Sequence, residues 1–422
     1  MTHPLIPSVA LLSLLSPALA CPELPGAKLE IPIQPGTSPD WASAEAPILT
    51  DHVRLTSPER FLKAGEAYFS PDASRVIFQA IEHPPEGEEP DTHYAMYVAD
   101  LLRDDNGAPT ALVNITRVSA PGSSNTCGWF HPTDRGRILF GSTITPLLDE
   151  DAPGYQRGTS RYSWQFPNEM EIVSTVLPDD LASGEIPEPT PIWTRDGYDA
   201  EASWSPDGRY ILYTRLEPSS ENAEPNGDLW IYDSANDTHT ALVTEPGYDG
   251  GPFFSSDGKR IIYRSDRRLD KHLQIYIGEL AFDDTGSVLG LEREIAITDN
   301  EHVNWCPFLN KRGDIALYAT SQVGHFNYEV FAVEAGTTGP QDKPAEARTR
   351  VRVTNAPGFD GLPVFSPDNN WVMWTSQRAA TEEEAGEATS QLWIARYDEP
   401  ALRRAMFDAA MRRAAGRPAD NN

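Results

Sequence analysis

The sequence predicts an all-β protein built as a six-bladed β-propeller. Three observations predict it: a short turn phrase that recurs six times, four strand-like segments in most repeats, and a spare strand-like segment ahead of the first repeat. Internal repetition favours one large unit over the two or three domains that 422 residues would otherwise suggest. Glycine (30) and proline (37) are spread along the chain, as in proteins with many short strands and turns.

The recurring phrase is an aromatic residue, then Ser-Pro-Asp-Gly or a variant of it, then a strand rich in β-branched and aromatic residues. In such a turn proline presets φ, aspartate bonds the nearby backbone, and glycine takes a positive φ. We number the repeats, and the blades they predict, in chain order. The six phrases begin at Phe69, Phe130, Trp204, Phe254, Phe308 and Phe365.

Most repeats continue into a third and a fourth strand-like segment, such as Leu229–Tyr232 and Ala241–Thr244 in repeat three. Four strands make a propeller blade, and a β-solenoid or two sandwiches are the alternatives. Repeat six stops at its third segment, Gln391–Ala395, whereas His52–Thr56 precedes repeat one and has the fourth-strand pattern. We therefore expect this N-terminal strand to complete the last blade, which closes the ring and removes exposed edges.

The Ser-Pro-Asp-Gly turns, and Tyr263–Arg267 leading to Gln274–Tyr276, resemble the propeller repeats of TolB and its relatives. The resemblance covers residues 52–398 and implies a six-bladed propeller. It does not imply one function, because the same blades carry scaffolds, lyases and peptidase-associated domains. TolB also has an α/β domain before its propeller, for which the stretch between Cys21 and His52 is too short, so the resemblance does not imply a role in a Tol–Pal system.

The N-terminus predicts export. Residues 1–20 read as a signal peptide, with an apolar run at Val9–Leu15 and a small-residue cleavage site at Ala18–Ala20. The apolar run is too short to span a bilayer. Cys21 follows the cleavage point as in a lipoprotein signal, so a lipid anchor is the alternative to plain cleavage. We expect plain cleavage, a periplasmic or secreted protein, and an N-terminal extension over residues 21–51.

The formal net charge of −29 limits the classes of partner. So acidic a surface repels nucleic acid phosphates and anionic membranes. We expect no nucleic acid partner and no transmembrane span. The expected partner is a protein or a glycan, and the expected state is a monomer.

Two columns of residues are expected at the mouth of the central channel. The loops before first strands and between second and third strands share one face, here the loop face, and the Ser-Pro-Asp-Gly turns lie on the opposite turn face. Alignment on the aromatic residues gives a first column of Ala64, Asn125, Asp199, Asp249, Val303 and Asp360. The second column is Glu66, Cys127, Glu201, Gly251, Trp305 and Leu362, with His302 one place outside the first.

These columns predict a binding site at the channel mouth, formed by Asn125, Asp199, Glu201, Asp249, His302 and Asp360. Carboxylates held close together raise one another's pKa or recruit a cation. A divalent cation, Ca²⁺ or Mn²⁺, would take Asp199, Asp249, Asp360 and His302 as ligands. The alternative is that each aspartate belongs to a repeated Gly-aromatic-Asp turn and bonds the backbone.

Repeat two carries a long insert at about residues 143–168 that combines aromatic residues with arginine, the composition of binding interfaces. We interpret it as a loop that binds a peptide or glycan, and the alternative is a loop packed over the neighbouring blade. Its candidate binding residues are Tyr155, Arg157, Arg161, Tyr162 and Trp164.

Two further features are expected from the pattern. Cys127 and Cys306 lie on opposite blades in columns that differ by one residue, so we expect them to face different sides and to form no disulfide. The pattern of residues 399–422 predicts a basic amphipathic helix and tail. We expect this helix to dock on its own acidic propeller, and binding to an anionic membrane is the alternative. The apolar stripe of that helix is Leu402, Met406, Phe407, Ala410, Met411 and Ala414.

The sequence lacks a Gly-x-Ser-x-Gly elbow, a phosphate loop, a dinucleotide fingerprint, His-Glu-x-x-His and Cys-x-x-Cys. We therefore interpret the protein as a non-catalytic binding or scaffold protein of the periplasm or cell envelope. The alternative is a metal-dependent carbohydrate enzyme. TolB-like propellers that are pectic-sugar lyases imply a channel metal bound mainly by histidine, and only His302 is well placed for that here. A sensor or peptidase-associated propeller is a third hypothesis.

Overall fold

The computed structural model describes residues 40–146, 166–183, 188–218, 226–336, 343–380, 384 and 389–416. They belong to the compact unit Ser38–Asn422, and the other unit, Met1–Thr37, lies outside the described residues. The predicted signal peptide, Cys21 and the five candidate residues of the blade-two insert also lie outside them. No helix among the described ranges is both long and apolar enough to cross a membrane.

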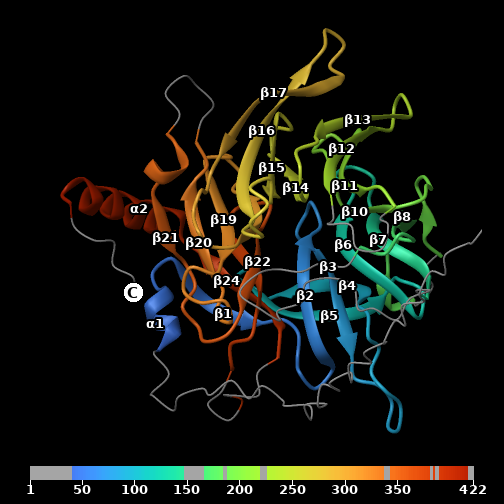
Figure 1. Cartoon of the computed structure of the whole chain (residues 1–422). Helices are drawn as coiled ribbons and strands as arrows, with labels where there is room; N and C mark the ends of the chain where they lie inside the picture. Colours follow the sequence, from blue (N-terminus) through green and yellow to red (C-terminus); the bar gives the residue numbers. More distant parts are fainter. Residues whose placement is uncertain are drawn as a thin grey trace, which may run out of the picture. The chain divides into compact units, whose positions relative to one another are not determined.

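Six four-stranded antiparallel sheets form the blades of a β-propeller (Figure 1). Blades one and two are β2 (Phe61–Phe69), β3 (Arg75–Glu82), β4 (Ala95–Arg103), β5 (Pro109–Arg117) and β6 (Ser123–Phe130), β7 (Arg137–Pro146), β8 (Glu171–Val176), β9 (Thr190–Pro191). Blades three and four are β10 (Tyr198–Trp204), β11 (Tyr210–Leu216), β12 (Gly227–Asp233), β13 (Thr238–Val243) and β14 (Asp249–Phe254), β15 (Arg260–Ser265), β16 (Gln274–Phe282), β17 (Val288–Ala296). Blades five and six are β18 (Asn304–Leu309), β19 (Ile315–Thr320), β20 (Glu329–Glu334), β21 (Arg350–Arg352) and β22 (Asp360–Phe365), β23 (Trp371–Ser376), β24 (Gln391–Tyr397), β1 (Leu49–Arg54).

Strand β1 confirms the predicted closure of the ring. It pairs antiparallel with β24, and Leu49 lies opposite Tyr397 and Val53 opposite Ile394. The first and last strands of the propeller therefore share one sheet, which leaves no gap between blades six and one.

The Ser-Pro-Asp turns form as their sequence predicts. In blade one the N–H of Ser70 donates to the carbonyl of Arg75 at 2.9 Å, and the Ser70 hydroxyl donates to Asp72. In blade five Asn310 takes the place of that serine, because its N–H donates to the carbonyl of Ile315 at 2.9 Å. Leu309, and not the predicted Phe308, is thus the residue before the turn.

The predicted alignment of blade five is therefore wrong by one residue. Asn304 belongs to the first column in place of Val303, and Cys306 belongs to the second in place of Trp305. The error has a simple origin: this turn lacks the Ser-Pro-Asp phrase, so an aromatic residue one position early was taken as its start.

Every first strand carries a β-bulge at the corrected second column, where the pairing register shifts. A bulge turns a side chain out of the plain alternation of a strand. Positive φ is rare for residues other than glycine, yet all six positions adopt it. These six bulge residues are Glu66 (45°), Cys127 (50°), Glu201 (57°), Gly251 (58°), Cys306 (47°) and Leu362 (56°).

An aromatic layer closes the channel two residues further along the first strands, on the turn-face side of the bulges. The rings of Tyr68 and Trp129 lie 4.9 Å apart, those of Trp129 and Phe253 5.4 Å, and those of Phe253 and Phe308 5.3 Å. The centre of the propeller is thus packed with side chains at this level and is not an open pore.

In the part of the chain that the structure describes, the α-helices α1 (Trp41–Glu45) and α2 (Glu399–Ala414) lie outside the blades. The Asp398 carboxylate caps α2 by accepting from the Ala401 N–H at 2.7 Å. Leu402 and Met406 are buried in a cluster with blades five and six, which confirms the predicted helix and places its first half against the propeller. Two short 3₁₀ turns occur at Leu181–Ser183 and Ala345–Ala347.

Candidate functional site at the centre of the propeller

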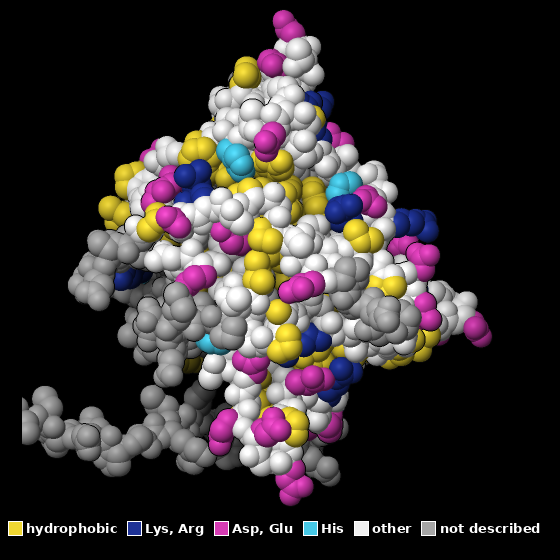
Figure 2. Space-filling model, turned by 90° about the vertical axis from the view of Figure 1, so that its right-hand side faces the viewer, with side chains coloured by type: hydrophobic (Ala, Val, Ile, Leu, Met, Phe, Trp, Pro, Cys, Tyr) yellow, Lys and Arg dark blue, Asp and Glu magenta, His cyan; other side chains and the backbone are white. Residues whose placement is uncertain are grey.

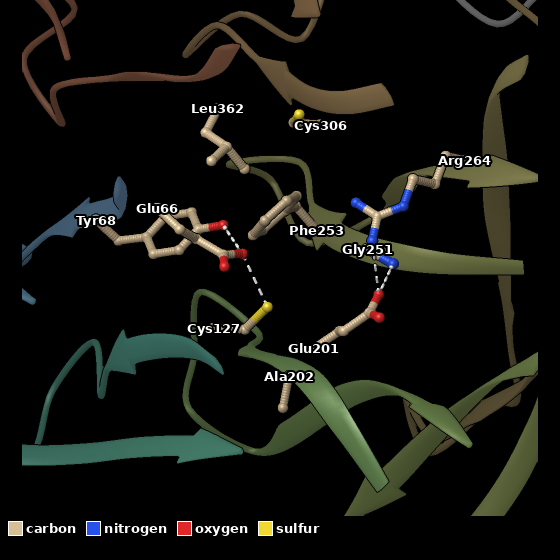
Figure 3. Close-up of a pocket in the computed structure, with 10 residues that line it drawn as sticks. All are labelled: Glu66, Tyr68, Cys127, Glu201, Ala202, Gly251, Phe253, Arg264, Cys306 and Leu362. Carbon is tan, nitrogen blue, oxygen red and sulfur yellow. Dashed lines mark hydrogen bonds and ion pairs between the residues drawn. The ribbon is translucent and has the colours of Figure 1, made fainter. Parts of the chain in front are cut away.

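The six bulge residues line one small cavity on the propeller axis (Figure 3). It measures about 10 Å³, room for about one water molecule. The remaining lining residues are Tyr68, Ala202, Phe253 and Arg264. A cavity of this size excludes a sugar or peptide from this level of the channel.

The Glu201 carboxylate, on the bulge of β10, accepts close hydrogen bonds from three donor groups. The Tyr248 hydroxyl lies 2.6 and 2.7 Å from its two oxygens, and the Gly251 N–H donates to Oε2 at 2.5 Å. Arg264 Nη2 donates to the same oxygen at 3.1 Å. Such a carboxylate is fixed in place by its neighbours, so we interpret Glu201 as a structural residue rather than a free base.

Arg264 projects from β15 toward the axis, as Figure 3 shows, and is 7% exposed. It also donates to the Tyr248 hydroxyl at 2.9 Å. Burial opposes its charge, but Tyr248 and Glu201 outweigh that effect and hold the pKa of Arg264 well above its usual value. Arg264 therefore stays charged inside the protein, where removal of its carboxylate partner would leave a buried charge without a counterion.

Glu66 and Cys127 form a second pair in the same cavity. The Cys127 thiol donates to Glu66 Oε1 at 2.8 Å, and the Tyr68 hydroxyl lies 3.3 Å from the same oxygen. Burial raises the pKa of Glu66. Burial and the nearby Glu66 raise the pKa of the Cys127 thiol well above its usual value. Cys127 is thus held as a neutral thiol, which is the unreactive form of cysteine.

Cys306 lines the same cavity from blade five, and both thiols are free. The prediction that Cys127 and Cys306 face different sides is wrong, because the corrected register puts both on bulges of the second column. Burial also raises the pKa of the Cys306 thiol well above its usual value. We call Glu66, Cys127, Glu201, Tyr248 and Arg264 the central cluster.

The predicted aspartates are each engaged by side chains of the protein. Asp199 is fully buried in blade three, where it accepts from Trp193 Nε1 at 2.7 Å and from Arg195 Nε at 2.9 Å. Asp249 pairs with Arg267 at 3.5 Å in blade four, and burial raises the pKa of Asp249 to about 7. Asp249 is thus bound within its own blade, whereas the partners of Asp199 lie in the segment that joins blades two and three.

The other predicted residues of the first column behave alike. Asp360 accepts from Trp374 Nε1 and from Arg378, both at 3.0 Å. The Asn125 amide donates to the carbonyl of Tyr94 at 2.9 Å. Asp199 and Asp360 thus bond arginine and tryptophan side chains rather than the backbone of the repeated turn.

His302 is half-buried beside the start of β18, and its N–H donates to Asn300 Oδ1 at 2.9 Å. Burial, together with the nearby His272, lowers the pKa of His302. Within the described residues no three His, Cys, Asp or Glu side chains are grouped so that they could hold a metal ion.

Phe166, the first described residue in the C-terminal part of the blade-two insert, packs against two tyrosines that contact Glu201 of the central cluster. Its ring is 5.0 Å from that of Tyr198 and 5.4 Å from that of Tyr248. The hydroxyls of both tyrosines contact Glu201. The C-terminal end of the insert therefore packs directly on the residues that hold the central cluster.

A second buried ionic group joins the two ends of the propeller. Glu45 of α1 accepts from Arg378 at 2.9 and 3.0 Å, and it lies 2.7 Å from His52 Nε2. Arg378 also donates to Asp360 and lies 4.4 Å from the centre of the Trp41 ring. Burial opposes ionisation of Glu45, but His52 and Arg378 outweigh it and lower the pKa of Glu45. We call Glu45, His52, Asp360 and Arg378 the terminal clasp.

Arg264, Tyr248, Glu45 and Arg378 were not predicted from the sequence. Arg264 directly follows the apolar run Ile261–Tyr263 of β15, and an arginine at the end of such a buried run is a signal of a buried ion pair. The clasp gave no comparable signal, because Glu45 and Arg378 are 333 residues apart.

Comparison with known proteins shows similarity at the level of the fold. No family model matches the chain. A 92-residue stretch is 35% identical to dipeptidyl-peptidase 5 of Porphyromonas gingivalis and spans 21% of this chain and 13% of that protein. TolB from Acinetobacter baumannii is 18% identical over 79% of this chain and 63% of its own, with a TM-score of 0.43. The chain thus spans less than two thirds of either protein.

Two other solved structures are similar across nearly their full length. A putative TolB from Agrobacterium tumefaciens is 16% identical over 81% of this chain and 92% of its own, with a TM-score of 0.45. An oligogalacturonate lyase in complex with manganese is 14% identical over 83% and 93%, with a TM-score of 0.40. At these identities no activity transfers. The chain is a six-bladed β-propeller similar to those of TolB proteins.

Proposed function

We propose that this protein is an exported, non-catalytic binding protein of the periplasm or cell envelope, and that its loop face binds a protein or glycan. One observation carries the proposal: the polar side chains around the channel are already bound to one another. Asp199 and Asp360 each contact an arginine and a tryptophan, and Glu201 contacts Tyr248 and Arg264. A general base must reach a substrate proton, and these groups are engaged within the protein.

Binding is assigned to the loop face because its loops are long and varied, whereas the turn face carries short turns. The blade-two insert is the proposed contact, with Tyr155, Arg157, Arg161, Tyr162 and Trp164 as its binding residues. Its composition supports this role, and so does the packing of Phe166 on Tyr198 and Tyr248.

A comparison of two variants tests this proposal. In the first, Tyr155, Arg157, Arg161, Tyr162 and Trp164 are all changed to serine. In the control, the exposed acids Glu86, Glu88 and Glu89 of the blade-one loop, on the same face, are changed to glutamine. The bait proteins are incubated with envelope extract and with a glycan array, and bound species are identified by mass spectrometry or array position.

We expect one protein or glycan that the wild type and the control retain and the insert variant loses. Equal retention by all three proteins would remove the insert from the binding site. Release of unsaturated sugars from oligogalacturonate, dependent on added Mn²⁺, would replace the proposal with the enzymatic alternative.

A further inference from the structure

Helix α2 carries an apolar patch on the side that faces away from the propeller. Leu402 and Met406 are buried, whereas Phe407 is 64% and Met411 55% exposed. Residues four apart share one side of a helix, and Arg404 lies on that side as well. We call Arg404, Phe407 and Met411 the helix patch. The helix is thus apolar on two opposite sides, and the described chain covers only one of them.

A second exposed apolar patch lies on the hairpin formed by β16 and β17. Phe282 is 40% and Leu289 63% exposed, close to the turn that joins the two strands. Asp284 and Glu292 are exposed on the same hairpin. We call Phe282, Asp284, Leu289 and Glu292 the hairpin patch. In Figure 1 the yellow hairpin and the red helix α2 both project from the edge of the propeller.

The charges of the two elements are opposite. Residues 399–414 hold four arginines and two acidic residues, a net charge of +2, in a chain whose net charge is −29. Residues 279–294 hold five acidic residues and one arginine, a net charge of −4. The face in Figure 2 shows how widely acidic side chains are spread, including on its protruding tips. An anionic membrane would attract the helix but repel most of the protein.

We propose that the protein forms a symmetric homodimer in which the helix patch of each copy binds the hairpin patch of the other. A two-fold arrangement makes the same contact twice, because residue i meets j and j meets i. Phe407 and Met411 pack against Phe282 and Leu289, and Arg404 meets Asp284 or Glu292. This inference is independent of the ligand on the loop face, and it replaces the monomer expected from the sequence.

Sedimentation velocity of the full mature chain tests the dimer. We expect a monomer–dimer equilibrium at micromolar protein that shifts to monomer when NaCl is raised from about 0.05 to about 0.5 M, since salt screens exposed charges. Phe407→Glu should give monomer at every salt concentration. The matched control is Leu102→Glu, a 49% exposed residue on blade one, which should sediment as wild type.

Charge reversal identifies the partner surface. Arg404→Glu and Glu292→Arg should each weaken dimerisation at least tenfold, and the double variant should recover most of the loss. A wild type that is monomeric at low salt, or a dimer unaffected by Phe407→Glu, would overturn the proposal. Binding of the wild type, but not of Phe407→Glu, to vesicles of phosphatidylglycerol and phosphatidylcholine would assign the helix patch to lipid and would also overturn it.

Discussion

The terminal clasp and the central cluster both bury an arginine beside a carboxylate, but they join different parts of the chain. In the clasp, Arg378 contacts Glu45 across 333 residues and so ties the N-terminal segment to blade six. In the centre, Arg264 contacts Glu201 across 63 residues and links blades three and four, which the chain already connects. The same ionic chemistry therefore closes the ring in one place and fills its axis in the other.

The partners of the two arginines differ in a way that matches these roles. Arg378 has no exposed side-chain surface and lies over the rings of Trp41 and Trp374 at 4.4 and 4.8 Å. Cation–π contacts of this kind are strongest when desolvated. Arg264 lies 5.6 Å from the Tyr248 ring and borders the small axial cavity. We infer that loss of the clasp opens the ring at β1, whereas loss of the central pair lowers the stability of the propeller without opening it at one place.

The largest effect is expected from deletion of residues 22–58, which removes β1 and Glu45 together. Blade six then exposes the free edge of β24, and open edges pair with other chains. We expect a protein that aggregates or melts far below the wild type, as followed by light scattering and circular dichroism. Unchanged thermal stability would contradict closure by β1.

The next effect is expected from Glu45→Gln, which leaves Arg378 without its main partner. Breaking a buried ion pair costs about 3–5 kcal/mol. The control is Asp51→Asn, also in the N-terminal segment, which breaks the exposed pair with Arg396 at a cost of at most about 1 kcal/mol. Hydrogen exchange should show lost protection in β1 for Glu45→Gln only. Loss spread evenly over all blades would show that the clasp has no special role in closure.

Arg264→Met should destabilise the centre by about 3–5 kcal/mol, because Glu201 is left buried beside fewer donors. Arg268→Met is the control, since Arg268 is more exposed and its partners Asp270 and Asp299 lie near the surface. Denaturant unfolding measures the difference, and β1 should keep its exchange protection. Adding Glu201→Leu to Arg264→Met should recover much of the loss, and a double variant no more stable than the single would argue against the pair.

The smallest expected effect is on the pH dependence of stability, which should change in opposite directions in variants of Asp249 and Asp233. The pKa of Asp249 is about 7 in the folded state, above its unfolded value, so its ionisation weakens folding as pH rises from about 4 to about 7. Asp249→Asn should therefore gain stability relative to wild type over that range. Blades two and five already hold Asn125 and Asn304 in this column, so the amide fits there.

Asp233→Asn is the control of opposite sign. A hydrogen bond from Arg209 lowers the pKa of Asp233, so its contribution is present at neutral pH and is lost as pH falls through that lowered pKa. Its variant should lose most stability near pH 7 and least in acid. Melting curves of both variants and of the wild type are measured between about pH 4 and about pH 7. Stability differences from wild type that have the same sign in the two variants would contradict the account.

Much of the fold follows from local sequence. The Ser-Pro-Asp turns and the orphan strand at His52–Thr56 predict six blades and their closure, because turn residues and strand alternation act over a few positions. Blade five was misaligned by one residue where Asn310 replaces the serine. That error left Cys306, which lines the cavity, out of the predicted second column.

The site was harder to predict, since its contacts join distant strands. Glu201 and Cys127 stand in a column that the repeat reveals, whereas Arg264 comes from a second strand and Glu45 from a short helix ahead of the propeller. A repeat shows which residues share a column. It does not show which charged side chain from another strand contacts them. The aspartate column shows this limit, because the arginine partners of Asp199, Asp249 and Asp360 lie outside the column.

The central claim is that protein side chains bind the channel carboxylates and that the protein binds a ligand without catalysis. Metal analysis of residues 22–422 tests it most directly. The protein is purified without chelator, and its Ca and Mn contents are measured by mass spectrometry for wild type, Asp199→Asn and Asp249→Asn. We expect no stoichiometric metal in any of the three. One equivalent of either metal in the wild type, lost in both variants, would contradict the account and make the channel a metal site.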